Sequence, residues 1–253
     1  MRALLTALCL ACPASQAAPA LLLGLGDQAT PPYKLSDTAV PADKPGVAVE
    51  LLQQAAARCD VPLRIKLLPG PRLLKELENG DLDAAGLLSY TPERAVYAVY
   101  PLHNGKPAEA LRLATLSYVL YARAGHRLQW DGTTLLGLTR KVGTNLGWSI
   151  NADLDKLGIP AEAASSVEQN FLKLQAGRID AYATHEPLGD SYLARHSTPN
   201  VVKLQPAVVA KPYYLIFSRS YAARHPAIAH CLWRQIGSLR DRFYQQRMPD
   251  YLD

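Results

Sequence analysis

A serine and an arginine follow an apolar run near residue 90, in an arrangement that can bind a carboxylate. Residues 84–88 predict a buried strand, and the segment 89–94 (SYTPER) predicts a turn into a helix with Thr91 as its N-cap. An arginine at the end of a strand can bind a carboxylate through its planar guanidinium, and Ser89 adds a hydroxyl five residues before Arg94. An ordinary capped helix with a solvated Arg94 is the alternative interpretation.

Two further segments place polar groups where a ligand can bind. Residues 142–149 (VGTNLGWS) predict a glycine-bearing loop that opens a helix ending at Gly158, and backbone N–H groups at such a helix start suit an anion. Residues 181–187 predict a strand that ends in His185 and Glu186 before a proline, and ligands gather at the carboxyl ends of strands in α/β sheets. Either segment also fits an ordinary helix start.

The sequence lacks the patterns of the common catalytic, metal and nucleic-acid sites. The six histidines are scattered, and the nearest pair, His225 and His230, is five residues apart and off one helical face. No zinc spacing, P-loop, dinucleotide fingerprint or nucleophile elbow is present. The net charge of +5 comes without a basic run interleaved with aromatic residues. We therefore predict a protein that is not an enzyme, with no metal, no cofactor and no nucleic-acid partner.

The elements that position these residues alternate between strands and helices, which predicts an α/β fold. In chain order, we expect a strand at 21–26, a helix at 46–59, a strand at 63–68, extended segments at 116–123 and 213–217, and a helix at 226–244. The pattern L-x-x-G-x-[L/I]-D-A occurs at 77–84 and again 97 residues later at 174–181, each time where a helix meets a buried strand. The repeat predicts two similarly built lobes, with the two extended segments crossing between them.

The first residues have the character of an export signal. Arg2 precedes an apolar run at 3–11, and the small residues Ser15 and Ala17 predict cleavage after Ala17. Cys12 partly fits a lipid-attachment pattern, but Cys9 stands where that pattern has leucine, so we predict no lipid anchor. After cleavage the protein is expected to be exported, and the family resemblance described next implies the periplasm. Cys59 and Cys231 then remain, each on an apolar helical stripe, and they form either one disulfide or two separate core thiols.

Taken in order, these motifs resemble the amino-acid-type periplasmic solute-binding proteins of bacterial ABC importers. The similarity covers most of the chain after residue 17, through segments 30–33 (TPPY), 46–52 (GVAVELL), 80–84 (GDLDA), 89–94, 142–149 and 176–181 (AGRIDA). The resemblance implies a type II periplasmic-binding fold in which two hinge strands join two lobes around a ligand cleft. It implies lobe 1 at 18–115 with 210–253, lobe 2 at 116–209, a monomer, and a membrane ABC permease as partner.

The resemblance also assigns roles to individual residues. It implies that Arg94 and Ser89 bind the ligand carboxylate from lobe 1, that Ser149 binds it from lobe 2, and that Tyr33 lines the apolar side of the cleft. Trp148, His185, Glu186 and Arg72 complete the candidate ligand-binding residues. The resulting expectation is an exported protein that captures a small carboxylate-bearing ligand, amino-acid-like or an organic acid, by hinge closure.

This sequence departs from the family pattern at three places. His185 stands where the family has an aspartate for the ligand's α-ammonium, so an ordinary α-amino acid is bound only if Glu186 turns inward. Gly70 replaces an aromatic residue that faces the ligand, and Trp148 is expected to fill part of that space. About a dozen extra residues lie near 103–113. Two alternatives stay open: an enzyme similar to cyclohexadienyl dehydratases, with His185 or Glu186 as acid/base, and a ligand-sensing accessory protein.

Overall fold

The structure is a computed structural model that describes residues 20–251 except Asp37 and Ser197. The predictions of a signal peptide at 1–17 and of an unmodified Cys12 lie outside the described residues. In the described part of the chain, no helix combines the length and apolar character needed to cross a bilayer.

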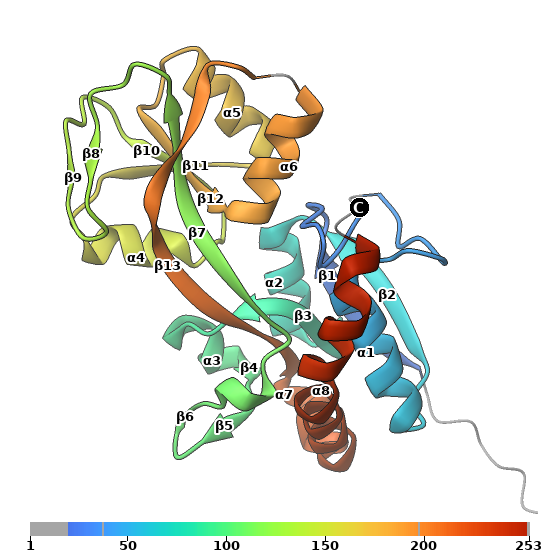
Figure 1. The fold of residues 1–253 in the computed structure, drawn as a ribbon. Helices are drawn as coiled ribbons and strands as arrows, with labels where there is room; N and C mark the ends of the chain where they lie inside the picture. The colour runs from blue at the N-terminus through green and yellow to red at the C-terminus, as the bar shows by residue number, and fades with distance from the viewer. Residues whose placement is uncertain (1–19, 37, 197, 252–253) are drawn as a thin grey trace, which may run out of the picture.

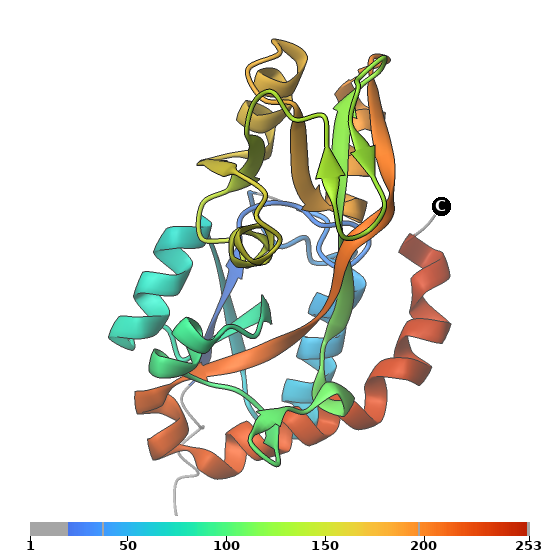
Figure 2. The same ribbon diagram turned by 90° about the vertical axis from the view of Figure 1, so that its left-hand side faces the viewer.

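One mixed sheet runs through two lobes, as the α/β prediction required (Figure 1). Within the described residues the sheet has nine strands, in the order β11-β10-β12-β7-β13-β3-β1-β2, with β4 (Ala98–Val99) paired to β13. The long strands β7 (Ala114–Arg123) and β13 (Val201–Ser218) pair antiparallel and pass from one lobe to the other (Figure 2). They correspond to the two predicted crossovers, and the expected lobe boundaries at 115/116 and 209/210 fall within them.

Lobe 1 is a three-layer sandwich around parallel strands. It contains β1 (Leu21–Gly26), α1 (Val47–Arg58), β2 (Leu63–Leu68), α2 (Gly70–Asn79), β3 (Ala84–Ser89), α3 (Pro92–Tyr97), α7 (Arg219–Arg224), α8 (Pro226–Arg247) and the short 3-10 helix η2 (Met248–Tyr251). The apolar stripe predicted for α1 is buried against β1 and α8, while Leu73 and Leu77 of α2 pack on the other face of the sheet. The sequence periodicity therefore located the face of α1 that enters this core.

Lobe 2 repeats the same three layers. It contains the small hairpin β8 (Gln129–Trp130) and β9 (Leu135–Leu136), then β10 (Val142–Asn145), α4 (Ile150–Lys156), β11 (Ala161–Ala164), α5 (Val167–Gln175), β12 (Ala181–His185) and α6 (Glu186–His196). Ile150 and Leu154 of α4 pack on one face of the sheet, and Phe171 and Leu174 of α5 pack on the other. Each lobe thus has apolar clusters of its own on both faces of the sheet.

The repeated sequence motif has the same structural role in both lobes. Gly80 and Gly177 follow α2 and α5 at φ values of 80° and 66°, a region that favours glycine. Asp83 Oδ2 accepts a hydrogen bond from the backbone N–H of Leu22 at 2.9 Å, at the start of β1. Asp180 Oδ2 accepts from the backbone N–H groups of Thr139 and Arg140, both at 2.6 Å, just before β10. Each aspartate therefore ties the motif to the start of a central strand.

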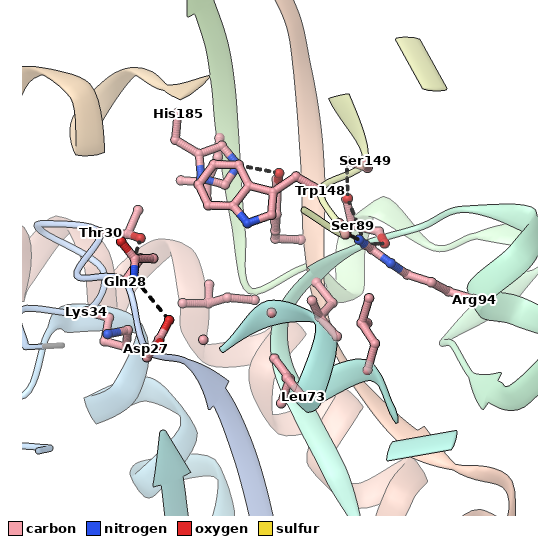
Figure 3. A pocket seen from close by; sticks show the side chains of 18 of the residues that line it. Asp27, Gln28, Thr30, Lys34, Leu73, Ser89, Arg94, Trp148, Ser149 and His185 are labelled. Carbon is pink, nitrogen blue, oxygen red and sulfur yellow. Dashed lines mark hydrogen bonds between the residues drawn. The ribbon is translucent and has the colours of Figure 1, made fainter. Parts of the chain in front are cut away.

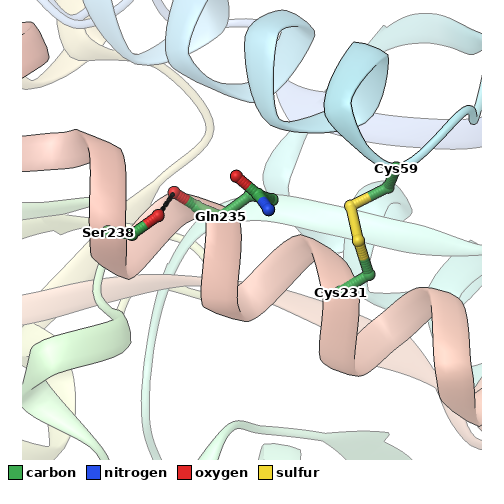
Figure 4. Close-up of a disulfide and its surroundings, with 4 residues drawn as sticks. All are labelled: Cys59, Cys231, Gln235 and Ser238. Carbon is green, nitrogen blue, oxygen red and sulfur yellow. Dashed lines mark hydrogen bonds between the residues drawn. A yellow bond between two sulfur atoms is a disulfide. The ribbon is translucent and has the colours of Figure 1, made fainter.

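The two remaining cysteines form a disulfide, as one of the two interpretations predicted (Figure 4). Cys59 lies at the C-terminal end of α1 and Cys231 in α8, with Cα atoms 6.0 Å apart and a sequence separation of 172. The bond lies inside lobe 1, where it fastens the first helix to the last long one.

The extra residues near 103–113 form a small extension of lobe 1. They include the hairpin of β5 (Leu102–His103) and β6 (Lys106–Pro107) and the 3-10 helix η1 (Glu109–Leu111). The buried guanidinium of Arg240 on α8 donates to the carbonyls of Ala110 and Arg112, both at 2.9 Å. These bonds hold the extension against α8.

Candidate functional site

A cavity of about 100 Å³ lies between the two lobes (Figure 3). Residues of β1, α2 and β3 and the loops that follow them supply the lobe 1 side, while the loop before α4 and the end of β12 supply the lobe 2 side. The apolar part of the wall is formed by Leu73, Leu74, Leu87, Leu88, Leu116 and Trp148. The cavity therefore lies at the carboxyl ends of strands from both lobes, where α/β sheets gather ligands.

Arg94 is buried at the junction of the two lobes, with 6% of its surface exposed. Thr91 caps α3 as predicted, its hydroxyl accepting from the backbone N–H of Arg94 at 3.2 Å. From this first turn the guanidinium donates through Nη1 to the carbonyl of Ser89 at 2.8 Å and through Nη2 to the carbonyl of Gly147, in lobe 2, at 2.7 Å. Arg94 thus joins the lobes while lining the cavity.

A chain of hydroxyl and ammonium groups continues from Arg94 into lobe 2. Ser89 Oγ donates to Ser149 Oγ at 2.8 Å, and Lys211 Nζ on β13 donates to Ser149 Oγ at 3.1 Å. Lys211 also forms an ion pair with Asp153 of α4. Ser149 is the N-cap residue of α4, yet its hydroxyl caps no backbone N–H and faces lobe 1 instead. The direct bonds between the lobes show that the cleft is closed.

His185 forms the inner wall of lobe 2 at the end of β12, as predicted for that strand. Its ring stacks on Trp148 with centroids 4.7 Å apart, and Nε2 lies 2.6 Å from the hydroxyl of Tyr213. Tyr213 in turn donates to the hydroxyl of Tyr118 at 3.1 Å. Burial, together with the positive charge of Lys211, lowers the pKa of His185 to about 3, so the imidazole is uncharged at neutral pH.

Trp148 and Gly70 meet across the cleft. A Cβ atom at Gly70 would lie 3.8 Å from Trp148 Nε1 and 3.4 Å from the carbonyl of Leu146. A larger side chain at residue 70 would therefore compete with the indole for the same space. Because Gly70 has no side chain, Trp148 occupies part of this space, as expected from the departure of residue 70 from the family pattern.

Of the eight predicted ligand-binding residues, five line the cavity: Ser89, Arg94, Trp148, Ser149 and His185. The other three lie elsewhere. Glu186 Oε1 accepts from Lys203 Nζ at 2.7 Å, and Arg72 donates to Glu76 at 2.7 Å on the outer face of α2. The ring of Tyr33 packs beside Tyr244, with centroids 6.0 Å apart. Glu186 therefore does not turn inward to supply the carboxylate missing at residue 185.

Several residues that the sequence analysis did not single out also line the cavity. They are Asp27, Gln28, Thr30, Lys34, Tyr118 and Tyr213. Asp27 and Gln28 directly follow β1, and their side chains are hydrogen-bonded to each other at 3.1 Å. In Figure 3 they lie across the cavity from Arg94. The rule that ligands bind at the carboxyl ends of strands applies to β1 as well, and it could have identified Asp27.

The arrangement is suited to binding an anion in a buried site. A guanidinium and two hydroxyls converge at one end, and hydrogen bonds to charged groups are strongest when both partners are shielded from water. The described residues contain no cluster of three or more histidine, cysteine or acidic side chains that could hold a metal ion.

Scans of the sequence match no family model and no curated protein. Solved structures do match. A histidine kinase sensor domain with similarity to periplasmic binding proteins aligns with a TM-score of 0.73 and 18% identity, over 93% of this chain and 97% of that chain. The L-glutamate complex of the GluR0 ligand-binding core from Nostoc punctiforme aligns with a TM-score of 0.68 and 17% identity, over 92% and 99%.

A third match is the substrate-binding protein of an amino acid ABC transporter, with a TM-score of 0.70 and 16% identity, over 92% of this chain and 99% of that chain. Each of these structures is covered almost completely, so the whole described chain, and not one lobe, shares their architecture. Two lobes, two crossover strands and a cavity between them agree with that similarity. The chain therefore has the two-lobed fold of type II periplasmic binding proteins.

Proposed function

We propose that this chain is an exported solute-binding protein that captures a small carboxylate-bearing molecule by closing its lobes, 18–115 with 210–253 and 116–209, around it. The observation that carries the proposal is Arg94, a buried guanidinium that lines the interlobe cavity and reaches both lobes. A carboxylate there can replace the Gly147 carbonyl as acceptor and also bind the hydroxyls of Ser89 and Ser149. Closure then follows from contacts that the ligand makes with both lobes at once.

The experiment is a binding screen of amino acids and organic acids by thermal shift, followed by isothermal titration of the hits. Arg94→Gln should weaken the affinity by about tenfold to a hundredfold, because a hydrogen bond to a charged group is worth about 1.5–3 kcal/mol. Arg94→Lys retains the charge without the planar fork and should bind with intermediate affinity. The matched control is Arg234→Gln, an exposed arginine on α8. Undiminished affinity in a folded Arg94→Gln protein refutes the site.

Two cellular roles fit this chemistry. In the first, the protein is monomeric, periplasmic and delivers its ligand to a membrane ABC permease, a role supported by the similarity to an ABC transporter's substrate-binding protein. In the second, it is a ligand-sensing protein, a role supported by the similarity to a histidine kinase sensor domain. Uptake of the radiolabelled ligand by cells lacking the gene separates them. Uptake falls if the protein serves import and is unchanged if it serves sensing.

A further inference from the structure

The lobe 2 wall of the cavity has no carboxylate among the described residues. That wall consists of Leu116, Tyr118, Gly147, Trp148, Ser149 and His185. Two acidic side chains that follow wall residues in the chain are engaged with lysines, Glu186 with Lys203 and Asp153 with Lys211. A cationic group of a ligand against this wall would therefore find no opposite charge.

The same wall does present one unused acceptor. Tyr213 donates its hydroxyl hydrogen to Tyr118, so the Tyr213 oxygen accepts from His185 Nε2–H. This network leaves His185 Nδ1 without a hydrogen and with an unused lone pair. His185 lines the cavity and is buried, with 7% of its surface exposed. Its Nδ1 atom has no hydrogen-bond partner among the described residues. A buried acceptor of this kind is costly unless a ligand satisfies it.

The charges around the site disfavour an ammonium group beside the ligand's carboxylate. Arg94 lies at the carboxylate position, and Lys211 lies close enough to His185 to affect its charge state. Asp27 is the one acidic residue in the described lining, and it lies across the cavity from Arg94 (Figure 3). An α-ammonium is bonded to the carbon next to the carboxylate, so it remains at the Arg94 end. It would be buried there without a counter-charge, which weakens binding.

We propose that the site selects small carboxylates that lack an α-ammonium group and carry an uncharged donor there, such as a 2-hydroxy acid, whose hydroxyl donates to His185 Nδ1. The inference rests on the proposed function, since it takes Arg94 as the carboxylate-binding group. It narrows the ligand class from carboxylates in general to those that an α-amino-acid site would reject. The leucine and tryptophan side chains of the wall accommodate an apolar remainder.

The test uses matched pairs that differ only at the α-carbon: L-leucine against L-2-hydroxy-4-methylpentanoate, L-phenylalanine against L-3-phenyllactate, and L-glutamate against L-2-hydroxyglutarate. Unsubstituted 4-methylpentanoate, 3-phenylpropionate and glutarate complete the three series. In the series whose members bind most tightly, isothermal titration should give the hydroxy acid an affinity about tenfold or more above that of the amino acid. Equal or tighter binding of the amino acid overturns the inference. Equal binding of the unsubstituted acid overturns the role of His185 Nδ1.

Two variants test the residue itself. His185→Asp places a carboxylate at the wall and should reverse the preference in favour of the amino acid. His185→Asn is the uncharged control and should leave the amino acid disfavoured. If His185→Asp does not fold, the wild-type series still decides the question. Arg94-dependent binding of amino acids by the wild type would overturn this inference alone, whereas failure of every acid to bind would overturn the proposed function as well.

Discussion

Removing the disulfide between Cys59 and Cys231 should lower the stability of lobe 1 without changing its ligand site. The bond joins the end of α1 to α8, two helices that share one apolar core with β1. The perturbation is the double substitution Cys59→Ser and Cys231→Ser, made in a chain that starts at residue 18 so that these are the remaining cysteines. Because the core contacts of both helices are retained, the main change is in the unfolded chain.

The magnitude follows from the length of the closed loop. The two cysteines are 172 residues apart, and the chain-entropy model assigns a loop of that length about 5 kcal/mol of stabilisation. For a chain of this size, 1 kcal/mol corresponds to about 2–4 °C in the midpoint of thermal unfolding. We therefore expect the double variant to unfold about 10–20 °C below the oxidised protein.

The assay is denaturant and thermal unfolding of the oxidised protein, the reduced protein and the double variant. The reduced protein and the double variant should unfold alike, and all three should bind ligand with the same affinity, because neither cysteine lines the interlobe cavity. Thiol titration of the denatured, unreduced protein should find no free thiol. A loss of less than about 1 kcal/mol in the double variant, or two free thiols in the wild type, would refute the reasoning.

Three further predictions concern the site and its supports. The pKa of His185 is lowered to about 3 by burial and by Lys211, while the unfolded value is near 6.5. Between these two pH values the unfolded chain binds the proton and the folded chain does not, so the free energy of unfolding should fall by several kcal/mol as pH drops from about 6.5 to about 3. In an acid titration, the His185→Asn variant should show a smaller fall. Gly70→Phe should displace Trp148, abolish ligand binding and expand the protein in solution scattering, whereas Gly70→Ala should change neither measurement. Asp180→Ala should cost about 0.5–1.5 kcal/mol in denaturant unfolding, because the hydrogen bonds to two backbone N–H groups before β10 are lost and only water replaces them; an unchanged midpoint would contradict the role assigned to the repeat.

Much of the fold could be predicted because its signals are local. The stripe of α1, the cap at Thr91 and the glycine after each repeat depend on neighbours a few residues away, and each is found where it was expected. The two long crossover strands also followed from their β-branched and aromatic composition. The extra residues near 103–113 could be recognised because the family pattern lacks them. Their attachment to Arg240 of α8 depends on residues far apart in the chain.

The sequence by itself determined the α/β class, the repeat that marks two lobes, and five residues of the cavity wall, Arg94 and His185 among them. Only the tertiary structure decided which way side chains at strand ends turn. Glu186 turns outward to Lys203, whereas Asp27 lines the cavity. The physical reason is that helix and strand patterns depend on near neighbours, while a site between two lobes depends on how distant segments meet. The closed cleft depends on such distant segments, since the hydrogen bonds of Arg94 and Ser89 to lobe 2 join residues 53 and 60 positions apart in the chain.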